Sequence, residues 1–156
     1  MKTIEELNKE LNSASYNNNL EIVKYLVKKG AITLNQALVN ASIKNNLEMV
    51  KFLIQKGATN LNYALIHASY SNKLETVKYL VEKGANDLNE ALEYAAKNNN
   101  LEMVKYLVKK GAKDLNGALS YASYKNNLEI ANFIKFVIDV RSNNIPIINN
   151  HTLLIS

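Results

Sequence analysis

The chain contains few side chains of the kinds that carry out catalysis. It has two histidines, His67 and His151, which lie far apart in sequence and have no partners at the spacing of a metal site. It has no cysteine, so disulfides, thiolate metal sites and a cysteine nucleophile are excluded. It also has no glycine-rich phosphate-binding loop. These residue types predict a protein that is not an enzyme and that binds no metal and no cofactor.

A glutamate recurs every 27 residues, each time directly after a leucine. A carboxylate in the first turn of a helix is stabilised by the helix dipole. Glutamates that stand a whole repeat apart are too distant for the ~5–9.5 Å carboxylate pairs of glycosidases. The row therefore indicates helix starts and not an acid–base pair. Its members are Glu21, Glu48, Glu75, Glu102 and Glu129.

Lysines form two further rows in a chain with a formal net charge of +5. Stacked repeats would align the rows into a basic stripe that binds phosphate groups, so a nucleic-acid or acidic-surface binder is one alternative function. Lysines near helix ends also complement the helix dipole, and Glu21 with Lys24 has the i, i+3 spacing of an ordinary surface pair. Because the chain has a single arginine, nucleic acid is the less favoured partner. The rows are Lys24, Lys51, Lys78 and Lys105, and Lys29, Lys56, Lys83 and Lys110.

The elements that would position these side chains come from an internal repeat. A 27-residue unit that begins with leucine recurs five times without insertion or deletion. Self-similarity at a fixed period is the signature of a stacked repeat protein, in which each unit contacts its neighbours. We expect a helix extension over residues 1–6 and a tail over residues 142–156. The repeats between them span residues 7–33, 34–60, 61–87, 88–114 and 115–141.

Each repeat has the pattern of two helices. The apolar residues of its first half fall at positions 1, 4, 5 and 8, which is the spacing of one helical face. An asparagine-rich turn follows, because asparagine tolerates left-handed backbone and caps helices, and the second helix stops at a glycine. Thr3 and Glu6 predict a capping box before a first helix over Ile4–Tyr16. Asp87 and Glu90 repeat that spacing.

The second helix of each repeat carries the most specific motif. In the fourth repeat it reads LEMVKYLVKKGA, from Leu101 to Ala112. This motif resembles the second half of an ankyrin repeat, and the likeness covers residues 7–133. The chain departs from the family in its Asn-x-Ala-Leu start, in the Asn-Asn between the helices, and in a unit about six residues shorter than the usual ~33. The resemblance implies a helical stack that lacks the protruding hairpin and whose first helices line a concave, partner-binding side.

The last repeat and the tail break the pattern. Ile138 and Asp139 replace the Gly-Ala pair, so the second helix is expected to continue to about Val140. We interpret the tail 142–156, with its single proline and two apolar clusters, as a C-terminal cap. A docking peptide is the alternative interpretation of the tail. A homo-oligomer assembled through it is a second alternative function.

The positions that vary between repeats carry most of the tyrosines. Positions 3, 6, 7 and 10 of the first helix lie opposite its packed face on a helical wheel, and six of the nine tyrosines fall there. Tyrosine is enriched in binding patches, so these positions are the expected contacts for a protein partner. The other tyrosines, Tyr25, Tyr79 and Tyr106, are expected to pack between second helices. The predicted partner-binding residues are Gln36, Val39, Ile43, Tyr63, Ile66, His67, Tyr70, Glu90, Glu93, Tyr94, Lys97, Ser120, Tyr121 and Tyr124.

These patterns together predict an all-α protein: an ankyrin-like α-solenoid of five helix-turn-helix repeats with a C-terminal cap. Hydrophobic residues make up 47% of the chain, which disfavours wholesale disorder. No apolar run approaches the ~18–20 residues of a membrane span, and the acidic N-terminus does not have the pattern of a signal peptide. We therefore expect a monomeric, intracellular and cytoplasmic scaffold that binds a partner protein.

Overall fold

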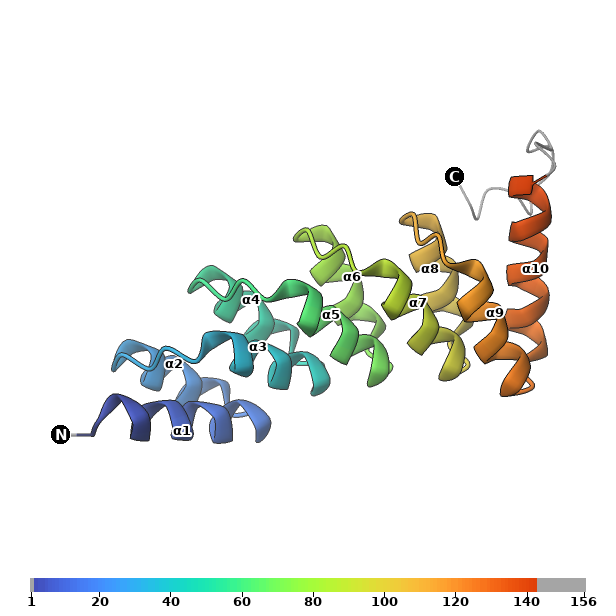
Figure 1. The fold of residues 1–156 in the computed structure, drawn as a ribbon. Coiled ribbons are helices and arrows are strands. Elements are labelled where there is room, and N and C mark those ends of the chain that lie inside the picture. The colour runs from blue at the N-terminus through green and yellow to red at the C-terminus, as the bar shows by residue number, and fades with distance from the viewer. Residues whose placement is uncertain (1, 143–156) are drawn as a thin grey trace. The chain divides into compact units, whose positions relative to one another are not determined.

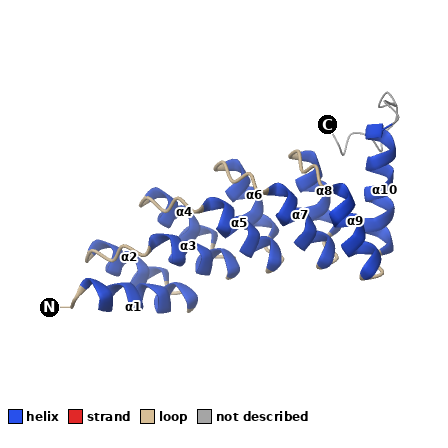
Figure 2. Ribbon diagram, in the orientation of Figure 1, coloured by secondary structure: helices blue, strands red, loops and turns tan. Residues whose placement is uncertain are grey.

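The computed structural model describes residues 2–142, which form ten helices and no strand (Figure 1, Figure 2). The all-α prediction is confirmed. The helices are α1 (Ile4–Tyr16), α2 (Leu20–Lys28), α3 (Leu34–Ile43), α4 (Leu47–Gln55), α5 (Leu61–Tyr70), α6 (Leu74–Glu82), α7 (Leu88–Lys97), α8 (Leu101–Lys109), α9 (Leu115–Tyr124) and α10 (Leu128–Ser142).

The chain divides into two compact units, which we call the N-terminal unit (Met1–Ala85) and the C-terminal unit (Asn86–Ser156). In the N-terminal unit α1 packs on α2, α3 on α4 and α5 on α6, and α3 lies between α1 and α5 (Figure 1). In the C-terminal unit α7 packs on α8 and α9 on α10, and the two pairs meet through α7 with α9 and α8 with α10. Each unit is therefore a stack of antiparallel helix pairs, in which the odd-numbered helix is the first helix of its pair.

Small residues line the packed side of the first helices. In α3, Ala37, Leu38 and Ala41 are fully buried, as are the three corresponding residues of α7. Two alanines in each set allow neighbouring first helices to approach closely, because side-chain size sets the distance between packed helices. The second helices supply larger residues to the same core, such as the fully buried Val50 and Leu53 of α4. The 3.6-residue periodicity of the sequence thus defines which side of each helix is left for solvent.

An asparagine with left-handed backbone joins the two helices of every pair, as predicted. The five residues have φ angles between 56° and 61°, a region that asparagine adopts more readily than other non-glycine residues. In three pairs the next asparagine caps the second helix; Asn19, for example, accepts a hydrogen bond from the Ile22 amide at 3.1 Å. The left-handed residues are Asn18, Asn45, Asn72, Asn99 and Asn126.

Four second helices end at a glycine, also as predicted. Gly57 has a φ of 103°, and the amide of the next residue, Ala58, donates back to the Leu53 carbonyl at 3.0 Å. This closure satisfies a carbonyl that the helix end would otherwise leave free. Helix α10 has no such glycine and continues to Ser142, slightly past the expected end at Val140.

The loops after α2, α4 and α8 are each held by an asparagine from the preceding first helix, a contact that the sequence did not predict. Asn35 is the clearest case: its Oδ1 accepts from the Thr59 amide at 2.8 Å and from the Asn60 amide at 3.1 Å. Asn8 and Asn89 accept equivalent hydrogen bonds from the backbone amides that lie 24 and 25 residues later in the chain, within their own units. This asparagine, at position 2 of the repeat, therefore links consecutive pairs within a unit.

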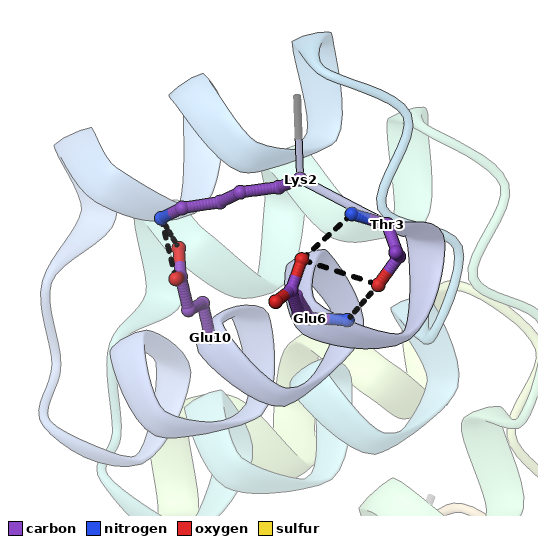
Figure 3. Close-up of polar contacts among 4 residues, drawn as sticks. All are labelled: Lys2, Thr3, Glu6 and Glu10. Atoms are coloured by element: carbon purple, nitrogen blue, oxygen red, sulfur yellow. Dashed lines mark hydrogen bonds and ion pairs between the residues drawn. The ribbon is translucent and has the colours of Figure 1, made fainter.

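The predicted capping box at α1 is confirmed, and the one predicted at α7 is wrong. Figure 3 shows the Thr3 amide donating to Glu6 Oε2 at 2.8 Å while the Glu6 amide donates to Thr3 Oγ1 at 3.2 Å. Lys2, which precedes α1, forms an ion pair with Glu10 of that helix (Figure 3). Asp87 makes no side-chain cap; its ψ of 55° is lower than the 72° of Asp114, which does cap its helix.

The single arginine of the chain links α10 to the C-terminal end of α8. Arg141 of α10 donates from Nη1 to the Ala112 carbonyl at 3.2 Å and from Nη2 to the Val108 carbonyl at 3.4 Å. A cation at the C-terminal end of α8 is favourable because the helix dipole is negative there. The predicted cap or docking peptide over the tail, together with the oligomer that would use it and with His151, lies outside the described residues from 143 onward.

Candidate partner-binding faces

The first helices of each unit leave their variable positions on one side, which we call the first-helix face. In the N-terminal unit this face carries Tyr63 and Tyr70 of α5, which are 48% and 59% exposed. The Tyr63 ring meets the His67 imidazole edge-on, with centroids 4.5 Å apart. An edge-to-face contact of this kind holds the tyrosine ring in one orientation without burying it. The face thus presents ordered aromatic surface to solvent.

The remaining predicted residues of the N-terminal unit differ in accessibility. Gln36 is exposed, and Ile43, Ile66 and His67 are half-buried. Val39 is only 3% exposed, so its assignment as a partner contact is wrong. Val39 lies on α3, which packs between α1 and α5. The helical wheel placed it on the open side because a wheel ignores how far neighbouring helices overlap.

The C-terminal unit has its own first-helix face on α7 and α9. Tyr121 and Tyr124 of α9 are 41% and 82% exposed, and Ser120 is exposed beside them. On α7, Tyr94 is half-buried, and the Lys97 ammonium lies 6.0 Å from the centre of its ring. The structure thus brings the α7 and α9 residues of the predicted set onto one side of this unit.

A hollow of about 420 Å³ lies on that face. We call it the α7–α9 hollow; five of its six lining residues come from α7 and the sixth, Tyr121, comes from α9. Asn89 was not among the predicted contacts, although its recurrence at position 2 of the repeat was visible in the sequence. The lining residues are Asn89, Glu90, Glu93, Tyr94, Lys97 and Tyr121.

Carboxylates converge at the edge of this hollow. Partial burial raises the pKa of the Glu93 carboxyl, and the charges of Asp114 and Glu90 raise it further. Gly117 stands at the same place: a Cβ atom there would lie 3.0 Å from both a carboxylate oxygen of Asp114 and one of Glu93. Because Gly117 has no side chain, the two carboxylates can occupy the space beside it. Gly117 is the one glycine of the chain that does not follow the end of a second helix, and this departure from the repeat is visible in the sequence.

Six of the eight lysines of the two rows lie over aromatic rings of the second helices. At the end of α2, the Lys29 ammonium is 5.6 Å from the centre of the Tyr25 ring, and the same i, i+4 contact recurs at the ends of α4, α6 and α8. A lysine of the preceding pair adds a second contact in two places, as Lys51 does to the Tyr79 ring at 5.6 Å. Lys24 pairs with Glu21 at 2.9 Å. These contacts give the lysines a local role on the helix surface.

Residues 2–142 contain neither a metal-ligating cluster nor a helix that could span a membrane. That part of the chain holds no group of three or more histidine, aspartate or glutamate side chains arranged to ligate a metal ion. None of its helices has both the length and the hydropathy needed to cross a bilayer.

Comparison with known proteins addresses the fold directly. The family model described as "Ankyrin repeats (3 copies)" matches residues 11–91, 38–116 and 65–144, and the successive matches begin 27 residues apart. None of the curated proteins compared with the chain matches it. Ankyrin repeats are generally protein–protein interaction modules, and the family is typically non-enzymatic. The period, the helix pairs and the family match agree, and the chain belongs to the ankyrin repeat family.

Proposed function

We propose that this chain is a non-enzymatic scaffold that binds a partner protein through the first-helix faces of its two units. The observation that carries the proposal is the exposure of tyrosine on those faces, with Tyr70 at 59% and Tyr124 at 82%. Tyrosine buries a large rigid surface on binding and loses little conformational entropy, which is why it is enriched where proteins meet. The proposed contacts are the predicted set without Val39.

The pattern of variation supports the same surface. The buried Ala37, Leu38 and Ala41 of α3 recur as Ala64, Leu65 and Ala68 in α5, whereas Gln36 and Ile43 correspond to the exposed Tyr63 and Tyr70. A stack requires the buried positions to be similar and leaves the exposed positions unconstrained. Large apolar rings at unconstrained positions cost solubility and gain nothing for the stack, so binding is the property that accounts for them.

Affinity capture with matched variants tests the proposal. The immobilised full chain is compared with Tyr70→Ala combined with Tyr124→Ala, which removes one exposed ring from each unit. The control is Tyr25→Ala, which removes a similarly exposed ring from α2, outside the first-helix faces. We expect the double variant to lose the specifically captured protein while the control retains it, with circular dichroism unchanged in both.

Salt separates this proposal from binding through the lysine rows. Contacts made by tyrosine change little with ionic strength, whereas contacts of lysine with phosphate weaken steeply. Retention of the captured protein by the double variant would contradict the proposal, as would its loss from the wild-type chain on a moderate rise in salt.

A further inference from the structure

The first-helix faces of the two units differ in charge. At positions 3 and 6 of the repeat, α7 carries Glu90 and Glu93, and the first helices of the N-terminal unit carry no carboxylate at either position. Asp114, at the start of α9, adds a third carboxylate next to Glu93. The C-terminal unit therefore presents concentrated negative charge within a protein whose net charge is +5.

No side chain of residues 2–142 neutralises the two glutamates of the hollow through an ion pair. The ion pairs of this part of the chain involve other glutamates, such as Glu10 with Lys2. Lys97 lines the hollow, but its ammonium is directed over the Tyr94 ring. Glu90, Glu93 and Asp114 against Lys97 leave a formal excess of two negative charges. Such an excess attracts a cation from outside the chain.

The walls of the hollow add a second feature that suits a cation. Tyr94 and Tyr121 line it together with the carboxylates. A lysine or arginine head group is attracted both by carboxylates and by the face of a tyrosine ring within ~6 Å. The position of Lys97 over Tyr94 shows that this ring face accepts an ammonium group. The volume of about 420 Å³ falls within the ~300–1,000 Å³ typical of ligand pockets.

We propose that the α7–α9 hollow binds a basic side chain, lysine or arginine, of the partner protein. This inference rests on the proposed function and specifies the chemistry of one contact in it. The aliphatic stem of the side chain packs against Tyr94 and Tyr121, and its head group lies between the glutamates and Asp114. Gly117 has no side chain, so the Glu93 and Asp114 carboxylates occupy the space beside it.

Solution NMR of the ¹⁵N-labelled full chain tests the inference with defined probes. Three acetylated peptide amides, Gly-Lys-Gly, Gly-Arg-Gly and Gly-Gln-Gly, differ only in the central side chain. We expect the lysine peptide, the arginine peptide or both to produce saturable shifts at the amides of Glu93, Tyr94 and Gly117. The glutamine peptide should leave these resonances in place. Equal shifts with all three peptides, or none with any, would overturn the inference.

Variants localise the effect. Glu93→Gln should weaken binding of the cationic peptide by about 1.4- to 5-fold, the range expected for loss of one partly exposed charge pair. Glu129→Gln, which neutralises an exposed carboxylate of α10 in the same unit, should leave binding unchanged. Lys97→Gln should strengthen binding because it removes the positive charge that competes for the hollow. Identical affinities in wild type and Glu93→Gln would contradict the assignment.

A calcium titration separates the inference from metal binding. Shifts of the same amides with calcium chloride alone, reversed by a chelator, would make the hollow a metal site and overturn the inference. The peptide titration needs no natural partner, so its result is independent of the capture experiment. Loss of capture by the tyrosine variants without peptide binding would leave the proposed scaffold intact and refute only the basic-side-chain contact.

Discussion

Replacing Asn35 with alanine tests how consecutive helix pairs are joined in the N-terminal unit. Asn35 Oδ1 accepts hydrogen bonds from the Thr59 and Asn60 amides, and a net hydrogen bond contributes about 0.5–1.5 kcal/mol. Thr59 and Asn60 are exposed, so water replaces part of what is lost, and alanine gains up to about 0.7 kcal/mol of helix propensity. The free energy of unfolding should therefore fall by about 1 kcal/mol.

Urea denaturation followed by circular dichroism measures the change. For a chain of this size, 1 kcal/mol corresponds to a fall of about 2–4 °C in the melting temperature. The matched control is Asn35→Asp, which keeps an acceptor oxygen in the same place and adds a negative charge in the first turn of α3, where the dipole favours it. Asn35→Asp should keep the wild-type stability. Equal destabilisation by aspartate and alanine, or none by either, would refute the assigned role.

Three further predictions concern single side chains. Gly57→Ala should lower the free energy of unfolding by about 1–2 kcal/mol, because an L-residue at a φ of 103° is strained, and Gly57→Asn should cost less in the same urea experiment. Because folding raises the pKa of Glu93, its contribution to stability is greatest below the ordinary value of 4.5 and is lost as the pH rises through the folded value. Glu93→Gln should therefore be more stable than wild type at pH 7, by a margin that shrinks on acidification, and a margin constant with pH would contradict this. Arg141→Ala should lower the stability of the chain by about 1 kcal/mol through loss of two carbonyl contacts, and unchanged urea unfolding would show that water replaces them fully.

The helix boundaries were predictable because their signals are local. Thr3 with Glu6, the left-handed asparagines and the glycine stops each act within about four residues, so their geometry follows from neighbouring sequence. Asp87 with Glu90 has the same spacing as Thr3 with Glu6 but forms no box. The spacing alone cannot specify the backbone angle of the capping residue, which the preceding loop determines.

The candidate site was predictable only in part, because it depends on contacts between helices. Asn35 and its loop partners are 24 and 25 residues apart, and nothing near Asn35 in sequence identifies them. Val39 is buried on α3, which packs between α1 and α5. The α7–α9 hollow requires that α7 and α9 lie side by side and that Gly117 leaves space for the Glu93 carboxylate. A single-helix wheel contains none of this information.

Amide hydrogen exchange of the full chain, with and without the captured partner, tests the central claim most directly. Binding through the first-helix faces should slow exchange in α5, α7 and α9 and leave α4, α6 and α8 unchanged. Protection confined to α4, α6 and α8, where the lysine rows lie, would contradict the claim.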